Sequence, residues 1–356
     1  MNRALLERQS LLRRRRVPAL EMIERLVALQ AQVPRDPYVA LWSRLDRFSP
    51  TALSDAMQDR RAVRLTLLRG TLHTVTARDA RELRPLMQSL VERVAWSQKG
   101  VRQARLSDTD RDELVGTFRS LLEDRPRTRA ELAEEIRGRY PGRDAAALSL
   151  VMYVLPTVQV TPRGVWRRTG PSAFTTLERW LGRSRTTAAT VEQLVLRYLA
   201  VFGPATHLDA QTWSGLQGLR AVFEGLRPRL RTFVADDGRE LFDVPGGAFR
   251  DPDTSAPVRF LPEYDNALIG FAERGRVLAD GVPQWTAAGW APVLVDGVGA
   301  APWRLFEERP GATMRIETFG RLPASAEDDV LAEGARLARF LLDGREAETR
   351  LGAYPA

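Results

Sequence analysis

The chain has 356 residues, 44% of them hydrophobic and 28% charged, a balance typical of a globular protein with roughly two to three domains. No apolar run approaches the ~18–20 residues that cross a bilayer, and the N-terminus lacks the apolar core of a secretory signal. We therefore expect a soluble, cytoplasmic protein that does not enter a membrane. The absence of cysteine excludes disulfides, thiolate metal sites and a thiol nucleophile.

Two further scarcities narrow the chemistry. The sequence has two histidines, His73 and His207, too few for a zinc or di-iron site, although an all-oxygen magnesium site stays open. Lys99 is the one lysine among 53 basic residues, which leaves almost no side chain for Schiff-base chemistry. We therefore expect an activity that needs neither a metal nor a cofactor.

The net charge of +8 is unevenly distributed. Residues 1–106 hold 21 basic and 10 acidic residues, whereas the remaining 250 hold 32 and 35. A basic third attached to a mildly acidic remainder suits a polyanionic partner, most simply nucleic acid. The run of four arginines at 13–16 also fits a solvated helix face, so composition alone leaves both interpretations open.

The periodicity predicts one supersecondary order three times, a set of helices followed by a hairpin. In the first copy we expect helices at 5–15, 20–29 and 51–59, strands at 63–67 and 71–76, and a long connecting helix at 77–105. In the second we expect a helix at 108–122, a short helix that begins with a capping box of Thr128 and Glu131, and a helix at 144–155. Strands at 158–161 and 165–168 follow. In the third we expect helices at 190–202, 206–213 and 216–226 and strands at 230–234 and 240–244.

Past Pro245, short β-rich runs alternate with Gly-rich turns and indicate a small sheet or partial barrel. The expected strands are 258–261, 276–278, 292–295, 302–306 and 313–319. A final helix at 326–342 is expected to present Leu331, Ala335, Ala338 and Leu342 to this sheet.

The predicted fold class is therefore α+β, with three tandem winged helices (a helix-turn-helix variant), a C-terminal β-rich region and a final helix. The expected regions are a first winged helix with its connecting helix (1–106), a second (107–183), a third (184–245) and the β-rich region (246–356).

Gln30 and Gln32 lie in the densest cluster of polar and aromatic residues, LQAQVPRDPY followed by LWSRL. Residues two apart point in different directions on a helix but share one side of an extended segment. Pro34 pushes Val33 into extended geometry, so the helix ends near Gln32 and both amides emerge together. They either form a functional pair or cover a frayed helix end with polar groups.

Two other clusters contain groups suited to chemistry. Thr71 and His73 alternate with Leu72 on the predicted first wing, which places His73 on the same strand face as Thr71. A single histidine there is more often a hydrogen-bonded structural residue than a base. Glu263 and Asp265 offer two carboxyls for acid–base work or for capping the turn after a strand.

Three segments together resemble the AlkZ-like winged-helix DNA glycosylases, bacterial enzymes of self-resistance to DNA-alkylating antibiotics: LVALQAQVPRDPYVALWSRL, RGTLHTVTARD and FLPEYDNALIGFAERGRV. The resemblance spans nearly the whole chain and implies three winged helices around a concave DNA-binding surface. Gln30, Ala31 and Gln32 match the family's Gln-apolar-Gln motif, which implies that Gln30 and Gln32 are the catalytic residues. A DNA-probing β-hairpin is also implied, and we consider residues 293–305, turning at Asp296 and Gly297.

The implied reaction suits two neutral amides. Alkylation at guanine N7 or adenine N3 makes the base cationic, and hence a good leaving group without protonation. The enzyme then needs to hold a water near the sugar C1′ and to stabilise developing oxocarbenium charge. A glutamine carbonyl accepts a hydrogen bond from that water, although no amide is a strong base. This predicts a monofunctional DNA glycosylase that leaves an abasic site, with bulky natural-product adducts and interstrand crosslinks as further candidate substrates.

The expected partner is double-stranded DNA containing alkylated purines, bound by a monomer. Arginine suits phosphate contacts because its planar fork binds two oxygens at once. The residues expected to bind DNA are Arg13, Arg14, Arg15, Arg16, Arg35, Arg44, Arg69, Thr71 and His73. The residues expected to support the site are Tyr38, Trp42, Tyr264, Asp265 and Asn266, with core packing as the competing role of Tyr38 and Trp42.

Two other functions fit the same residues. A non-catalytic winged-helix DNA-binding regulator, or a lesion-binding resistance protein, needs the same basic third and the same repeats. A hydrolase that acts on a small molecule through Glu263 and Asp265 is the weakest of the three hypotheses.

Overall fold

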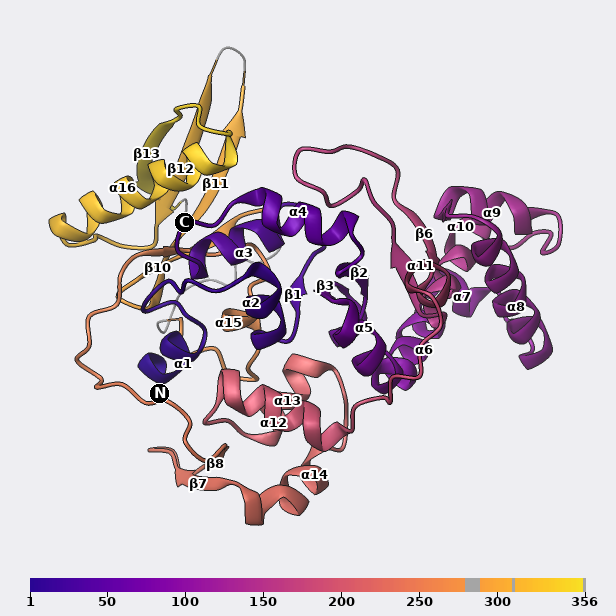
Figure 1. Ribbon diagram of the computed structural model, residues 1–356, viewed down its shortest axis with the longest axis horizontal. Coiled ribbons are helices and arrows are strands. Elements are labelled where there is room, and N and C mark those ends of the chain that lie inside the picture. The colour runs from indigo at the N-terminus through magenta and orange to yellow at the C-terminus, as the bar shows by residue number, and fades with distance from the viewer. Residues whose placement is uncertain (279–288, 309–310, 355–356) are drawn as a thin grey trace.

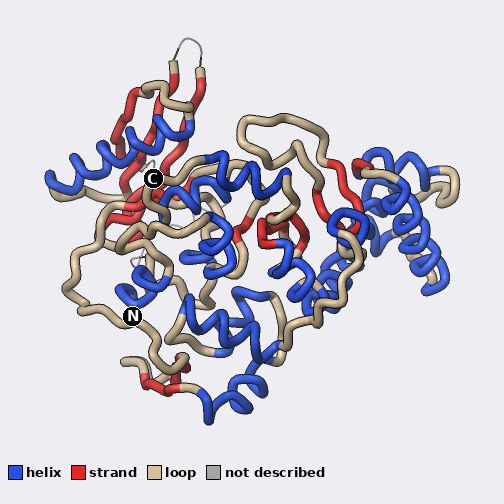
Figure 2. Tube along the Cα trace, in the orientation of Figure 1, coloured by secondary structure: helices blue, strands red, loops and turns tan. Residues whose placement is uncertain are grey.

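The computed structural model describes residues 1–278, 289–308 and 311–354. Helices dominate the part of the chain before residue 245, and a β-sheet with a long helix forms the C-terminal part (Figure 1). Loops are long in places, as Figure 2 shows for the segment between β5 (Thr157–Gln159) and β6 (Ala173–Thr176). The predicted mixed α+β class, with a C-terminal sheet and a final helix, is confirmed.

The first two helices are shorter than predicted. The N-terminal elements are α1 (Asn2–Arg8), α2 (Ala19–Arg25), β1 (Leu29–Gln30), α3 (Asp36–Arg44) and α4 (Pro50–Gln58). Ser10 and Val27 follow the first two helices with φ values of 58° and 69°, left-handed conformations that interrupt a helix. The expected spans 5–15 and 20–29 are therefore wrong at their C-terminal ends. Because α2 stops early, Leu29 and Gln30 are free to enter a sheet.

The hairpins of the first and second regions share one sheet instead of forming two separate wings. Its strands lie in the order β1-β3-β2-β5-β6-β4. They are β2 (Ala62–Thr66), β3 (Leu72–Thr76), β4 (Arg127–Thr128), β5 (Thr157–Gln159) and β6 (Ala173–Thr176). The junction between the two regions is the antiparallel pair of β2 with β5, where Leu65 faces Val158.

The expected single helix at 77–105 is wrong. The segment is divided into α5 (Ala77–Leu83), a 3₁₀ turn (Pro85–Met87), α6 (Gln88–Ser97) and α7 (Lys99–Gln103). Pro85 has no amide hydrogen, and its ring clashes with the preceding turn, so a continuous helix cannot pass through it.

The second region agrees with prediction up to its hairpin. α8 (Asp108–Asp124) and α9 (Arg129–Arg137) form, and the capping box of Thr128 and Glu131 is present. The expected helix at 144–155 divides into α10 (Ala145–Leu148) and a 3₁₀ turn (Ser149–Val154). The expected strand at 165–168 is wrong, because β5 pairs with β6 and residues 165–168 lie in the intervening loop.

The third region follows the predicted order. Its elements are α12 (Val191–Phe202), α13 (His207–Ser214), α14 (Leu219–Leu226), β7 (Arg231–Val234) and β8 (Glu240–Asp243), preceded by the short helix α11 (Leu177–Leu181). Thr190 and Thr206 cap α12 and α13 with reciprocal hydrogen bonds to the third residue of each helix.

The C-terminal sheet has the strand order β13-β12-β11-β10-β9. Its elements are β9 (Arg259–Phe260), α15 (Asn266–Ile269), β10 (Ala291–Val295), β11 (Val298–Glu307), β12 (Ala312–Thr318), α16 (Ala324–Leu341) and β13 (Glu348–Ala353). The expected strand at 276–278 is wrong, since this segment contributes an isolated bridge between Leu278 and Gly299. α16 buries Ala338 as predicted, but Leu331 and Ala335 are half-buried while Val330 and Leu337 take the core positions.

The first and third regions share one hydrophobic core with the loop after β9, whereas the second region has a core of its own. Helix α13 contacts both the 3₁₀ turn Leu68–Gly70 and α15, and α3 contacts β1. Segments far apart in the sequence therefore meet around the end of β1, where Gln30 lies.

Candidate functional site

Gln30 and Gln32 converge at the end of β1. Gln30 is the cross-strand partner of His73 on β3 and is 8% exposed, whereas Gln32 lies beyond the strand and is exposed. Gln30 Nε2 donates a hydrogen bond to Gln32 Oε1 at 2.5 Å. The two amides therefore lie on the same side of an extended segment, as their spacing predicts.

Arg69 fixes the orientation of the Gln30 amide. Arg69 Nη2 donates to Gln30 Oε1 at 2.6 Å and to Asn266 Oδ1 at 3.1 Å, and Arg69 Nη1 donates to the carbonyl of Trp213. A guanidinium can only donate, so the Gln30 oxygen has to face it and the Gln30 NH₂ group has to face Gln32. The arrangement is a directed chain of hydrogen bonds from Arg69 through Gln30 to Gln32.

The Arg69 side chain carries its charge without a carboxylate partner among the described residues. Burial lowers the pKa of Arg69 to about 10, so the group is still cationic at neutral pH. Its backbone has a φ of 55°, a left-handed conformation that costs about 1 kcal/mol or more outside glycine. Gly215 ends α13 against this turn, where a Cβ atom would lie 2.9 Å from Arg69 Cα. This strained position is therefore fixed by close packing of α13.

His73 is a neutral, buried member of the same cluster. Its Nδ1 lies 2.9 Å from the carbonyl of Thr71, and because that oxygen accepts only, Nδ1 carries the proton. The unprotonated Nε2 then faces Arg69 Nη2 at 3.5 Å. Burial, and secondly the charge of Arg69, lower the pKa of His73 to about 3. His73 is buried, and the half-buried Arg69 donates both terminal nitrogens inside the protein, so neither side chain is presented to a DNA phosphate in this structure. Their contact with DNA stays a prediction.

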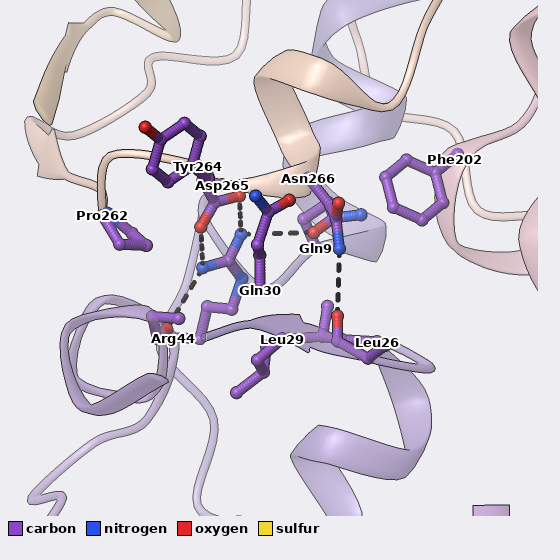
Figure 3. A pocket seen from close by; sticks show the side chains of 12 residues that line it. Gln9, Leu26, Leu29, Gln30, Arg44, Phe202, Pro262, Tyr264, Asp265 and Asn266 are labelled. Carbon is purple, nitrogen blue, oxygen red and sulfur yellow. Dashed lines mark hydrogen bonds and ion pairs between the residues drawn. The ribbon is translucent and has the colours of Figure 1, made fainter. Parts of the chain in front are cut away.

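A small cavity lies behind Gln30 and is closed by the loop 262–266 (Figure 3). Its volume is about 10 Å³, room for about one water molecule. Asn266 closes one side, since its Nδ2 donates to the carbonyl of Ala28 at 3.0 Å. The half-buried ring of Tyr264 lines the cavity as well, and burial raises the pKa of its hydroxyl. Tyr264 and Asn266 therefore do lie beside Gln30.

Arg44 and Asp265 form a buried ion pair beneath this cavity (Figure 3). Arg44 is 1% exposed, and its two terminal nitrogens donate to the two Asp265 oxygens at 2.9 and 2.7 Å. Asp265 also accepts from the backbone N–H of Ala267 and so caps α15. Because the charge of Arg44 is satisfied inside the protein, the structure gives no support to the expectation that Arg44 binds DNA, which stays a prediction. Asp265 is likewise not a free acid for hydrolysis of a small molecule.

The four arginines at 13–16 lie at the opposite end of α3 from Gln32. Arg15 forms a bridge with Leu45, the residue after α3. Arg14 pairs with Glu333 at 2.5 Å, Arg15 with Glu7 at 3.5 Å and Arg16 with Asp46 at 2.7 Å. Arg13 is exposed. The structure therefore does not bring this basic run to the glutamines.

The remaining predicted side chains are distributed around α3. Tyr38 is 1% exposed and donates to the carbonyl of Gly164 at 2.8 Å, so it is a core residue. Trp42 is half-buried, with Arg14 4.5 Å from its ring centre. Thr71 donates to the carbonyl of Leu68 at 3.1 Å and stays half-buried. Arg35, at the start of α3, lies near Gln32 in the chain and is half-buried.

The hairpin considered for DNA probing forms but is not free. β10 and β11 turn at Asp296 and Gly297, which have φ values of 45° and 80°. Arg3 donates to Asp296 Oδ1 at 2.8 Å, and Asn2 Nδ2 donates to the carbonyl of Gly297 at 2.8 Å. The hairpin therefore forms where it is predicted, but its tip is held against α1. Its role in probing DNA stays a prediction. The arms of β11 and β12, in contrast, extend away from the body of the molecule (Figure 1).

Two buried ionisable residues beside the glutamines were missed. Arg64 is 2% exposed and donates to the carbonyl of Ala31, while its Nε and Nη1 have no hydrogen-bond partner among the described residues. Asp36 is 4% exposed, its Oδ2 likewise has no partner in the described part of the chain, and its pKa is raised to about 8, chiefly by burial. The sequence does contain a signal for Arg64, because it is an arginine inside the otherwise largely apolar strand AVRLT. Arginine is rarely fully buried unless its charge is paired.

Within residues 1–278, 289–308 and 311–354, no group of three or more acidic or histidine side chains is arranged to hold a metal ion. In the same part of the chain, no helix combines the length and the apolar character of a membrane span.

The comparisons with known proteins agree with this architecture. A family model described as DNA glycosylase AlkZ-like matches residues 23–340, and the chain therefore belongs to the AlkZ-like DNA glycosylase family. The solved structure of the Streptomyces sahachiroi DNA glycosylase AlkZ is similar, with a TM-score of 0.71 and 18% sequence identity over 98% of each chain. A search of curated proteins finds no match. At this identity the structural likeness shows the fold alone.

Proposed function

We propose that the protein is a monofunctional DNA glycosylase that hydrolyses the N-glycosidic bond of cationic N7- or N3-alkylpurines in double-stranded DNA and leaves an abasic site. The observation that carries the proposal is the hydrogen-bond chain from Arg69 to Gln30 to Gln32, which ends at an exposed amide. Family membership supports the reaction class. No cofactor is required.

The chain of hydrogen bonds gives each glutamine a different role. Gln30 uses its oxygen toward Arg69 and its NH₂ toward Gln32, so it orients its neighbour. Gln32 keeps the second lone pair of Oε1 and both protons of Nε2 for groups outside the protein. The lone pair accepts a hydrogen bond from the attacking water, and the Nε2 protons bind an acceptor of the DNA beside C1′. Holding water in this geometry supplies catalysis without a strong base.

The neutral state of the site restricts the substrate. His73 and the two amides do not protonate a leaving base at neutral pH, since the pKa of His73 is lowered to about 3. The nucleobase therefore has to leave without being protonated by the enzyme. An alkylated purine can do so because it is already cationic. Bulky natural-product adducts and interstrand crosslinks belong to the same proposal, because such alkylation also leaves the purine cationic.

We extend the proposal to the architecture of the chain. Residues 1–106, 107–183 and 184–245 are three winged helices around a concave DNA-binding surface, and residues 246–356 complete it. The order of helices followed by a hairpin supports this assignment in the second and third regions. The β11–β12 hairpin is the better candidate for probing DNA, because the β10–β11 turn is bound to α1.

The test is an excision assay on a duplex with one N7-methylguanine, in which alkali cleaves the strand at abasic sites. We expect wild type to produce abasic sites in the methylated duplex and none in the unmodified one. Gln32→Ala should lower the single-turnover rate at least ~100-fold, the cost typical of misplacing a reacting group. Gln217→Ala, at an exposed position of the loop before α14, is the matched control.

The second candidate, a DNA-binding protein without catalysis, keeps the same basic residues and helix–hairpin units. It predicts tight, sequence-selective binding with no abasic product from any N7- or N3-alkylated duplex. That pair of results would replace the glycosylase proposal.

A further inference from the structure

The loop between β5 and β6 encloses a second pocket close to the glutamines. Its volume is about 130 Å³, well above the ~10–15 Å³ that holds one water. It is lined by Arg35, the residue before α3, by Tyr38 of α3, by Trp166, Arg167 and Arg168 of the loop, and by Glu307 of β11. The loop residues are those that the sequence pattern assigns to a strand, and the function described so far makes no use of them.

The loop is a rigid wall. Trp166 packs on Tyr38 with ring centres 4.9 Å apart, and its Nε1 donates to Asp343 at 2.7 Å. Arg167 Nε donates to the same carboxylate at 2.9 Å. Arg167 has a φ of 54°, a strained conformation that these contacts maintain. A wall that is fixed before a ligand arrives lowers the ordering cost of binding.

The pocket carries an excess of unpaired positive charge. Arg35 and Arg168 form no hydrogen bond or ion pair through their side chains with the described part of the chain, although the Arg35 guanidinium lies 5.9 Å from the centre of the Trp303 ring. Arg64, which is outside the lining, is a further buried charge with two nitrogens that have no partner among the described residues. Glu307 is the one carboxylate in the lining, and Arg167 and Arg345 lie 3.8 and 3.5 Å from it. A small anion is therefore the ligand that this pocket fits.

The position of the pocket indicates which anion. Arg35 is three residues from Gln32, so their Cα atoms are at most ~11 Å apart. Phosphates repeat every ~3.4 Å of helix axis along one DNA strand, which places the pocket within about three nucleotides of the sugar facing Gln32. The rings of Trp166 and Tyr38 suit the apolar face of a deoxyribose next to the phosphate.

We infer that the pocket between α3 and the β5–β6 loop binds one phosphodiester of the DNA backbone near the lesion, through Arg35 and Arg168. The inference rests on the proposed function for the presence of DNA at this face. It adds a positioning subsite that sets the register of the damaged strand relative to Gln32.

The experiment measures binding of a duplex that carries one N7-methyl-2′-fluoro-2′-deoxyguanosine. This lesion fixes the register of the protein on the DNA, and the fluorine at C2′ blocks excision, so the readout does not depend on excision. A neutral methylphosphonate is placed at each linkage in turn. In wild type, one linkage should reduce affinity ~10-fold or more, the range for a hydrogen-bonded charge. In R35Q/R168Q that linkage should become indistinguishable from the others, and the slope of log affinity against log salt should fall by ~0.9.

R183Q/R185Q is the matched control, since it removes two exposed arginines from the segment between α11 and α12. The inference is overturned if the control changes the salt slope as much as R35Q/R168Q does, or if no single linkage stands out in wild type. It is also overturned if inorganic phosphate alone binds in an Arg35- and Arg168-dependent way without any linkage effect, because the site then serves a free anion.

The two proposals fail separately. A position-specific effect in a protein that produces no abasic sites supports the subsite and removes the glycosylase. Excision with no position-specific effect does the reverse. Thermal unfolding checks the folding of the variant, which loses the contact of Arg35 with the Trp303 ring but no side-chain hydrogen bond to the described residues.

Discussion

Arg69 Nη2 donates a hydrogen bond to Gln30 Oε1 at 2.6 Å, and this contact decides which way the Gln30 amide points. The guanidinium belongs to a half-buried, strained residue and is surrounded by neutral acceptors. A protein does not maintain such a combination for stability, since an exposed side chain at this turn would avoid both costs. Arg69 is therefore best understood as a positioning residue for Gln30 and, through it, for Gln32.

Arg69→Gly is expected to reduce excision ~100-fold while leaving the affinity for undamaged duplex close to wild type. Glycine accepts the φ of 55° without strain, so the loss of function should not be a loss of folding. Added guanidinium ion should restore part of the single-turnover rate by filling the vacated space. The same addition should not help Gln30→Ala, and rescue of both variants, or of neither, would contradict the positioning role.

His73 is expected to contribute no inflection to the pH dependence of the excision rate. Its pKa is lowered to about 3, so the rate should show no inflection near the ordinary value of 6.5. The folded protein holds His73 neutral, whereas the unfolded chain protonates it below pH 6.5, so this stabilisation is present above 6.5 and lost as the pH falls toward 3. Single-turnover rates between pH 5 and 7 test the first point, and an inflection near 6.5 that disappears in His73→Asn would contradict it.

The sequence predicted elements best where local signals are strong. The capping box predicted at Thr128 marks a helix start correctly, because reciprocal hydrogen bonds between residues three apart are local. The helices expected from 190 and 206 also begin there, and the structure shows a capping box at each start. The strand predicted at 165–168 does not form, because tertiary contacts determine the conformation of this segment. Tyr38, more than a hundred residues earlier, binds the carbonyl of Gly164 and holds the chain as a loop.

The candidate site shows the same division. The extended spacing of Gln30 and Gln32 predicts that their amides meet, and they do. The role of Arg69 was not predictable, because its partners Trp213 and Asn266 come from segments with no sequence relation to it. A count of arginines does not show which of them contact phosphate and which are hydrogen-bond donors inside the protein. Arg44 is of the second kind, and its partner Asp265 lies 221 residues away in the sequence.

Breaking the pair of Arg44 and Asp265 is expected to be strongly destabilising. Asp265→Ala leaves the Arg44 charge buried without a carboxylate, which costs about 3–5 kcal/mol of unfolding free energy. The double variant Arg44→Met/Asp265→Ala should recover much of the loss, because no charge is then stranded. Urea unfolding measures both, and the exposed pair of Glu348 and Arg350 is the control, where Glu348→Ala should cost less than about 1 kcal/mol. Equal losses for the two single variants would contradict the argument.

Asp36 is expected to make the protein less stable as the pH rises. Burial raises its pKa from 3.8 to about 8, so between these values the folded state keeps a proton that the unfolded state has lost. Stability from this group is complete below pH 4 and declines by about 1.4 kcal/mol per pH unit at most, until the folded group ionises near pH 8.

Asp36→Asn keeps the shape without the ionisation, so its urea midpoint should exceed that of wild type at pH 9 and match it near pH 4. Asp112→Asn, at an exposed position of α8, should show no such difference between the two pH values. If Asp36→Asn is instead less stable than wild type at pH 9, the carboxylate is charged and paired in the folded protein, and the burial argument fails.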